Sequence, residues 1–171
     1  MVILVTGGSK SGKSKIAENL LLQAEHKIYI ATMEPFGDEA QAAISRHRNQ
    51  RLGKGFETLE RSRDIHMLDI PNGTDGILLE CLSTLCANEM FSGKEQAPAD
   101  KIFNGIKLLK EKTTLLVIVT SSVNCDGIEY PTETENYIRA LCELNRRVAD
   151  FSDTVIEAVC GIPVVLKGAV L

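Results

Sequence analysis

The apolar residues of this chain fall into short continuous runs separated by segments with helical spacing. The runs predict buried strands, because a run without polar alternation suits a strand that is covered on both faces. We expect these strands at residues 2–6, 27–32, 77–81, 115–120, 154–160 and 164–167, with a weak further candidate at 65–70. A Gly-Ile-Pro turn at 161–163 is expected to join the last two strands.

Apolar residues spaced three and four positions apart predict helices between the strands. They cover residues 14–23, 38–51 and 99–112, a segment that starts near Ser83, and a long helix whose apolar face runs from Tyr137 to Phe151. Strands and helices alternate along the chain, and this order favours parallel pairing with helices on both faces of the sheet. The predicted fold class is therefore a doubly wound α/β sheet.

Length and composition narrow the class of protein. A chain of 171 residues has the size of one domain, so we expect a single domain over residues 1–171. Its 19 basic and 23 acidic side chains give a net charge of −4, which argues against a nucleic-acid partner. Five cysteines at irregular spacings indicate neither disulfides nor a zinc site. With no signal-peptide pattern and no apolar run of the ~20 residues that span a membrane, a cytoplasmic location is expected.

A phosphate-binding pattern lies between the first strand and the first helix, where a match to GxxxxGK[ST] carries weight. Its residues are Gly7, Gly8, Ser9, Lys10, Ser11, Gly12, Lys13 and Ser14. The backbone N–H groups of such a loop cradle phosphate oxygens, and the helix that follows directs its positive end to the same place. Lys13 is expected to contact the β- and γ-phosphates of a nucleoside triphosphate, and the Ser14 hydroxyl to ligate Mg²⁺.

Two further groups are candidates for the same chemistry. Glu80 lies near the end of the strand at 77–81 and can hold the metal through water, although a solvated strand-end glutamate is the alternative. On the helix at 38–51, His47, Arg48 and Arg51 share one face behind Ile44. That stripe suits a polyphosphate, and a neutral imidazole there can attack phosphorus. The alternative is a solvated basic helix end.

These motifs resemble one known family along essentially the whole chain. The matching segments, in order, are ILVTGGSKSGKS, IYIAT, Ile44-x-x-His47-Arg48-x-x-Arg51, Phe56-x-Thr58-x-Glu60, LLECLSTLCAN, Asn145, Gly161-x-Pro163 and Leu166-Lys167. They are similar to the bifunctional adenosylcobinamide kinases / adenosylcobinamide-phosphate guanylyltransferases of cobalamin synthesis.

The resemblance implies a RecA-like P-loop NTPase fold, a homotrimer, and two reactions. In the first, ATP or GTP phosphorylates adenosylcobinamide; in the second, His47 takes GMP from GTP and passes it to adenosylcobinamide phosphate. Mg²⁺ is the implied cofactor, and Lys13 and His47 are the implied catalytic residues. Beyond the loop at 7–14, the implied nucleotide contacts are Thr32, Met33, Glu34, Arg48, Asn49, Gln50, Arg51, Glu60 and Glu80.

The chain departs from the family pattern after its strand at 115–120. Where the family has N-E-V-G-x-G-I-V-P, Ser122 replaces the glutamate and Asn124 replaces a glycine. The altered stretch at 121–131 is the expected substrate-side loop. Two other readings remain open: a P-loop kinase of a small molecule without guanylyl transfer, which needs only the P-loop, and a non-catalytic GTP-binding regulatory module, which the altered loop keeps open.

Overall fold

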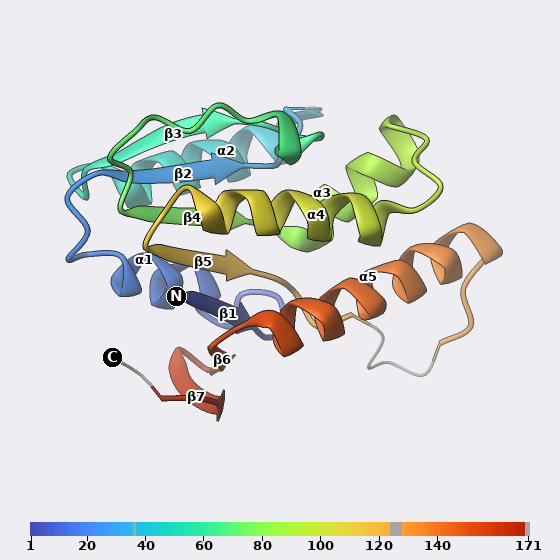
Figure 1. Cartoon of the computed structure of the whole chain (residues 1–171). Helices are drawn as coiled ribbons and strands as arrows, with labels where there is room; N and C mark the ends of the chain where they lie inside the picture. The colour runs from blue at the N-terminus through green and yellow to red at the C-terminus, as the bar shows by residue number, and fades with distance from the viewer. Residues whose placement is uncertain (36, 124–127, 170–171) are drawn as a thin grey trace.

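In the part of the chain that the structure describes, seven strands form one sheet at the centre of the protein (Figure 1). The computed structural model describes residues 1–35, 37–123 and 128–169, and on helix α2 it describes the backbone but not the side chains at 39, 40, 43, 46, 47 and 50. The sequence positions 124–127, including Asn124, Cys125 and Gly127 of the expected substrate-side loop, lie outside the described residues.

The strands follow the order β3-β2-β4-β5-β1-β6-β7 across the sheet. Their bounds are β1 Val2–Thr6, β2 Lys27–Ala31, β3 Phe56–Glu60, β4 Gly76–Glu80, β5 Leu115–Val119, β6 Thr154–Val159 and β7 Ile162–Lys167. All neighbouring pairs are parallel except β6 and β7, which form an antiparallel hairpin. The carboxyl ends of β1, β2 and β4 therefore meet at one edge of the sheet, the usual place for a ligand in such a fold.

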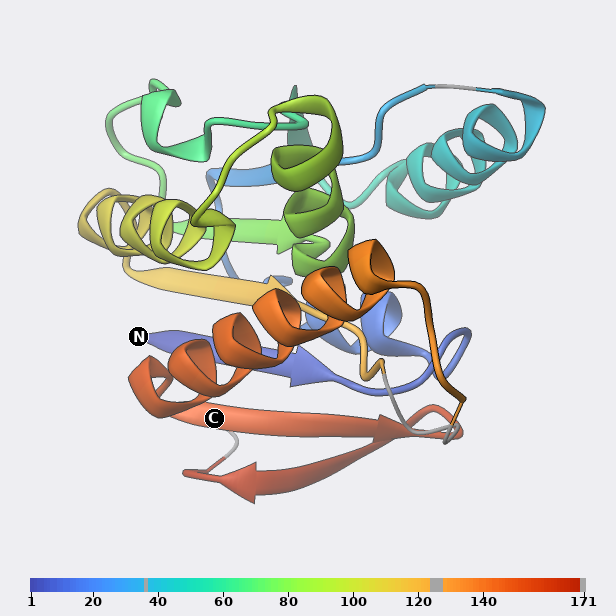
Figure 2. The same cartoon turned by 90° about the vertical axis from the view of Figure 1, so that its right-hand side faces the viewer.

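Helices cover both faces of the sheet (Figure 2). The bounds are α1 Lys13–Leu20, α2 Gly37–Arg51, α3 Leu82–Ala87, α4 Pro98–Glu111 and α5 Thr132–Phe151. One apolar core joins α3, α4 and α5 to one face, and a second core joins α1 to the other. Helix α2 stands apart from the others, on the side of α1 (Figure 2). None of the helices that the structure describes is long and apolar enough to cross a membrane.

Two predicted elements were wrong, and one strand was missed. The weak strand candidate at 65–70 is instead a 3₁₀ helix, η1, over Ile65–Met67, where Ile65 packs into the core. The predicted turn at 161–163 is shorter, because Ile162 and Pro163 already belong to β7, an edge strand that tolerates proline. Strand β3 carries polar residues on both faces and pairs with β2 alone, so it has no continuous apolar run. A short π-helical segment, η2 Asn88–Ser92, extends α3.

The close packing of η1 against α4 depends on Gly105 of α4. A Cβ built on Gly105 would lie 2.6 Å from Cγ1 of Ile65 and 3.2 Å from the backbone nitrogen of His66. A glycine inside a helix normally costs about 1 kcal/mol relative to alanine. Here the missing methyl group is what allows η1 to pack directly against the helix.

We expect Gly105→Ala to lower the free energy of unfolding by about 1–3 kcal/mol, because overpacking against Ile65 outweighs the gain in helix propensity. Urea denaturation measures the effect. Asn104→Ala, at the exposed neighbouring position, is the matched control and should be neutral or slightly stabilising. A Gly105→Ala protein as stable as the original would contradict this account of η1.

Candidate functional site

A cleft of about 1100 Å³ opens at the carboxyl edge of the sheet, between the loop after β1 and helix α2. The predicted site residues that line it are Ser9, Lys10, Ser11, Gly12, Lys13, Ser14, Thr32, Met33, Arg48, Arg51, Glu60 and Glu80. They come from the β1–α1 loop, the ends of β2, β3 and β4, and α2. Residues far apart in the sequence are thus brought to one cavity.

The loop from Gly7 to Ser14 is fixed by contacts with the end of β6. Gly7 has a φ of +140°, and a Cβ there would lie 2.7 Å from the carbonyl oxygen of Ala158. The backbone N–H of Gly161 donates to the carbonyl oxygen of Ser11 at 2.8 Å. Only glycine allows this close approach of two backbone segments. The hairpin of β6 and β7 therefore supports the loop from behind.

Lys13 is the first residue of α1, and it is largely buried at the wall of the cleft. Its Nζ donates to the carbonyl oxygen of Gly8 at 2.6 Å. Burial lowers the pKa of the Lys13 ammonium, while nearby Cys81 and Glu80 act in the opposite direction. The ammonium thus has an acceptor within the loop and lies where a polyphosphate is expected.

Glu80, at the end of β4, is buried and uses both carboxylate oxygens. The Ser14 hydroxyl donates to Oε1, and the Tyr29 hydroxyl donates to Oε2 at 2.9 Å. Burial, and after it the charge of Glu80, raises the pKa of the Tyr29 phenol, so this hydroxyl is a proton donor. The alternative of a solvated strand-end glutamate does not describe Glu80, whose carboxylate is held on both sides.

The oxygen atoms of Ser14 and Glu80 fit a magnesium ion in their chemistry. A hydroxyl and a carboxylate are hard oxygen donors, and the two are in direct contact. In the part of the chain that the structure describes, no three His, Cys, Asp or Glu residues are grouped to hold a metal by themselves. Such a pair suits an ion that takes its remaining ligands from nucleotide phosphates and water.

Helix α2 is tied to the sheet at its carboxyl end. Arg48 forms an exposed ion pair with Glu60, the last residue of β3. Arg51 is buried, and its guanidinium carbon lies 3.4 Å from the centre of the Tyr29 ring. Among the described residues, neither Nε nor Nη1 of Arg51 has a hydrogen-bond partner. Both nitrogens are buried, so Arg51 borders the cleft with two donor groups that are removed from solvent and unpaired among the described residues.

The three residues that follow β2, at 32–34, differ in how they lie relative to the cleft. Thr32 is buried, and its hydroxyl joins β2 to β4, because it donates to the Glu80 carbonyl oxygen at 3.0 Å and accepts from the Cys81 N–H. Met33 lines the cleft. Glu34 faces Arg63 and accepts a hydrogen bond from Ser92, so its carboxylate is engaged outside the cavity lining.

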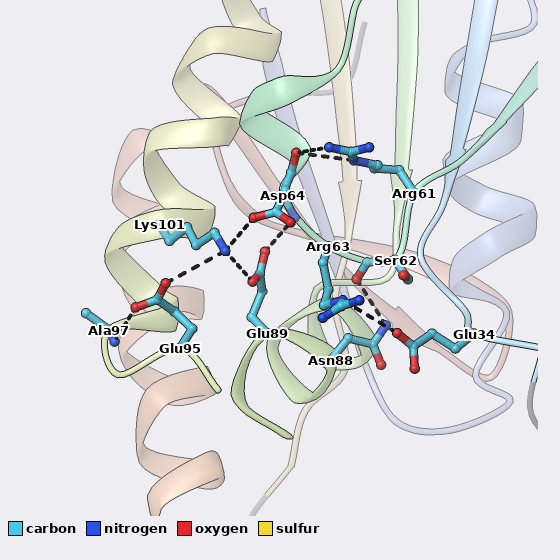
Figure 3. A network of polar contacts seen from close by, with 10 residues as sticks. All are labelled: Glu34, Arg61, Ser62, Arg63, Asp64, Asn88, Glu89, Glu95, Ala97 and Lys101. Carbon is cyan, nitrogen blue, oxygen red and sulfur yellow. Dashed lines mark hydrogen bonds and ion pairs between the residues drawn. The ribbon is translucent and has the colours of Figure 1, made fainter. Parts of the chain in front are cut away.

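A polar network holds the segments after β2 and β3 in place (Figure 3). The Asn88 side chain donates to the carbonyl oxygens of Thr32 and Ser62, at 2.8 and 3.1 Å. Beside it, Lys101 of α4 bonds the buried carboxylate of Glu89, and the backbone N–H of Asp64 donates to the same carboxylate. The network joins this rim of the cleft to α4 and η2 and holds it in position.

Asp64 belongs to the same network through its side chain. Lys101 also pairs with the Asp64 carboxylate at 2.6 Å, and this hydrogen bond holds the pKa of Asp64 below its ordinary value. Asp64 itself has a left-handed backbone, with a φ of 54°. The ion pair thus stabilises an uncommon turn directly before η1.

The remaining predicted residues fall outside the cavity lining or the described side chains. Gly7 and Gly8 shape the loop behind the cleft, and Asn49 is exposed on α2 without lining it. His47 and Gln50 lie on α2 by their backbone, but their side chains are outside the described part of the structure.

Glu18, Tyr29 and Lys54 are among the cleft residues that sequence reasoning missed. Glu18 of α1 is buried and accepts a hydrogen bond from the Lys54 ammonium, which follows α2. Its position four residues after Ser14 on a helix was an available signal, since it puts a carboxylate on the same face as the metal-side hydroxyl. Tyr29 was the other available signal, because it is the single residue with a polar tip inside the run IYIA.

The fold and the loop together define a P-loop nucleotide-binding protein. A solved structure of a prototypical ATPase from the type III secretion system of pathogenic bacteria has the same fold, with a TM-score of 0.52 over 96% of this chain and 56% of that chain. Its sequence is 14% identical, so this likeness concerns the fold alone. The predicted P-loop α/β class is confirmed.

The particular family follows from sequence comparison. The family model for cobinamide kinase / cobinamide phosphate guanyltransferase matches residues 3–166, and the chain belongs to this family. The bifunctional adenosylcobalamin biosynthesis protein CobU of Salmonella typhimurium is 33% identical over 98% of this chain and 100% of its own length. CobU of Escherichia coli is 32% identical over the same shares, and CobP of Pseudomonas aeruginosa is 25% identical over 96% of both chains. The resemblance found from the motifs is thus confirmed.

We expect Lys54→Met to destabilise the protein by on the order of 2–3 kcal/mol, because it leaves the Glu18 carboxylate buried without its cation. Thermal or urea unfolding measures this change. Adding Glu18→Gln to the Lys54→Met variant removes the stranded charge and should recover much of the loss. Equal stability of the Lys54→Met protein and the original would show that the pair contributes nothing.

Proposed function

We propose that this chain catalyses both reactions of its family at the one cleft. It phosphorylates adenosylcobinamide with ATP or GTP, and it transfers GMP from GTP to adenosylcobinamide phosphate. The observation that carries the proposal is the shared cleft: the phosphate-binding loop and helix α2 form its walls. The triphosphate and the residue that receives GMP can then be in contact within one cavity.

His47 is the proposed nucleophile for the GMP transfer. A helix brings positions 44, 47, 48 and 51 to one face, and Ile44, Arg48 and Arg51 line the cleft. A neutral imidazole nitrogen attacks the α-phosphorus of GTP, the bond to the bridging oxygen breaks, and pyrophosphate leaves. Arg48 and Arg51 are the proposed cations that stabilise the charge at this phosphorus.

The second half-reaction returns the histidine to its starting state. A phosphate oxygen of adenosylcobinamide phosphate attacks the same phosphorus, and the N–P bond to His47 breaks. The products are adenosylcobinamide-GDP and a free imidazole, so every bond broken is matched by a bond formed and no further reactant is needed. In the kinase reaction the substrate hydroxyl attacks the γ-phosphorus instead, and Lys13 offsets the charge that develops there.

Ser14 and Glu80 are the proposed residues for Mg²⁺, which supplies charge stabilisation to the phosphates when it is bound. The chain itself contributes the position of the Ser14 hydroxyl, through its hydrogen bond to Glu80. Corrinoid binding and the cytoplasmic location remain part of the proposal.

We expect His47→Ala to abolish GMP transfer and to leave nucleotide binding intact. The protein is incubated with Mg²⁺ and GTP labelled at the α-phosphate and then denatured. Label on the protein should survive alkali, be lost in acid and be absent from His47→Ala, while His66→Ala, with its exposed side chain on η1, retains it.

The same assay separates the other readings. Phosphorylation of adenosylcobinamide without any protein label would assign a small-molecule kinase, and GTP binding without either transfer would assign a regulatory module. Full guanylyltransferase activity in His47→Ala would contradict the role of this histidine.

A homotrimer is the proposed assembly. Every residue of β7 is exposed, and the apolar side chains of Ile162, Val164, Val165 and Leu166 lie uncovered on this edge strand. An apolar patch of that kind favours burial between subunits. We expect light scattering to give three times the mass of one chain and Leu166→Lys to lower it. A monomer in the original protein would contradict the proposal.

A further inference from the structure

We infer that Tyr29 is a positioning residue that connects the carboxylate of Glu80 to the helix bearing His47. This inference rests on the proposed function, because that function gives the two ends of the connection their roles. Tyr29 lies in β2, beside β4, and contacts one partner with its hydroxyl and another with its ring.

The hydroxyl end of Tyr29 orients Glu80. In the parallel register Tyr29 pairs with Leu78 and Ala31 pairs with Glu80, so the phenol extends along the sheet toward the end of β4. Its hydroxyl donates to Oε2 at 2.9 Å, while Ser14 occupies Oε1. A carboxylate with both oxygens bonded keeps one orientation, and here that orientation holds the Ser14 hydroxyl in place.

The ring of Tyr29 anchors α2. Arg51 lies 3.4 Å from the ring centre, and among the side chains that the structure describes on α2 it is the buried one. The other tie described above, between Arg48 and Glu60, is exposed on both sides. Exposed ion pairs contribute little to stability, whereas a desolvated cation over an aromatic ring contributes more. The carboxyl end of α2, one turn after position 47, is therefore held by Tyr29.

The side chain of Tyr29 thus contacts both the Glu80 side and the α2 side of the cleft. Tyr29 packs in the α1-side core against the sheet, which fixes its ring while its hydroxyl bonds Glu80. Loss of the hydroxyl and loss of the ring should have different consequences, and this difference makes the inference testable. Tyr29→Phe removes the bond to Glu80 and keeps the surface for Arg51, whereas Tyr29→Leu removes both.

The first measurement is the equilibrium affinity for GTP with Mg²⁺ and with a chelator. A hydrogen bond to a charged group corresponds to about tenfold or more in an equilibrium constant. Tyr29→Phe should lose about tenfold of affinity in the presence of Mg²⁺ and keep the metal-free affinity of the original. Tyr137→Phe is the matched control, because its hydroxyl donates to the carbonyl oxygen of Ser83. It should leave both affinities unchanged.

The second measurement is amide hydrogen exchange across residues 38–51. Tyr29→Leu should accelerate exchange in this segment, and Tyr29→Phe should not. Arg51→Met keeps Tyr29 in place and should reproduce the acceleration, so the test does not depend on the folding of Tyr29→Leu.

Two results would overturn the inference. One is an equal loss of affinity in Tyr29→Phe with and without Mg²⁺; the other is unchanged exchange of residues 38–51 in both Tyr29→Leu and Arg51→Met. Neither readout requires GMP transfer. A failure of the proposed function, seen as absent labelling of the original protein, is therefore distinguishable from a failure of this inference.

Discussion

The buried carboxylate of Glu80 is the constraint on which the cleft depends. A charge removed from water needs hydrogen bonds to remain stable, and Glu80 obtains them from Ser14 and Tyr29. The backbone around it is held as well, since Thr32 bonds the Glu80 carbonyl oxygen across the adjacent strand. The first turn of α1 and the ends of β2 and β4 are thereby fixed relative to one another, and the phosphate-binding loop is placed above them.

The walls of the cleft are attached to the sheet in different ways. The phosphate-binding loop rests on β6 through backbone contacts, and α1 packs into an apolar core. The rim after β2 and β3 is fastened by the amide of Asn88 and by the ion pairs of Lys101. Helix α2 instead contacts the sheet through two arginines. The firmly attached parts carry the proposed phosphate contacts, and the more weakly attached part carries the proposed nucleophile.

Much of this arrangement could be predicted from the sequence, for identifiable reasons. The strands at 2–6, 77–81 and 115–120 are continuous apolar runs because both of their faces are covered. The phosphate-binding loop is a local motif, in which spacing alone specifies the backbone. The helix at 38–51 was also found, and it ends at the expected residue, Arg51.

The features that could not be predicted from the sequence depend on contacts between segments that are distant in the chain. Strand β3 pairs on one side only and keeps polar residues on both faces, so its pattern carries no strand signal. Ile65 is an isolated apolar residue that is buried because Gly105 leaves room for it. Glu34, whose nucleotide contact stays a prediction, pairs with Arg63 and Ser92, which its local sequence did not indicate. In each case the deciding partner is remote in the chain.

The hydrogen bond between Lys13 and the carbonyl oxygen of Gly8 has a consequence for the order of events in catalysis. A buried ammonium without an acceptor would be costly, and this bond satisfies it before any phosphate arrives. In the proposed reaction, an incoming polyphosphate therefore replaces the Gly8 carbonyl as the acceptor for Lys13, and this contact adds to the affinity only the difference between the two hydrogen bonds. When pyrophosphate departs, the ammonium can return to the loop carbonyl. Under the proposed mechanism, the loop carbonyl thus takes the place of the departed phosphate at Lys13, which favours release of pyrophosphate over its tight retention.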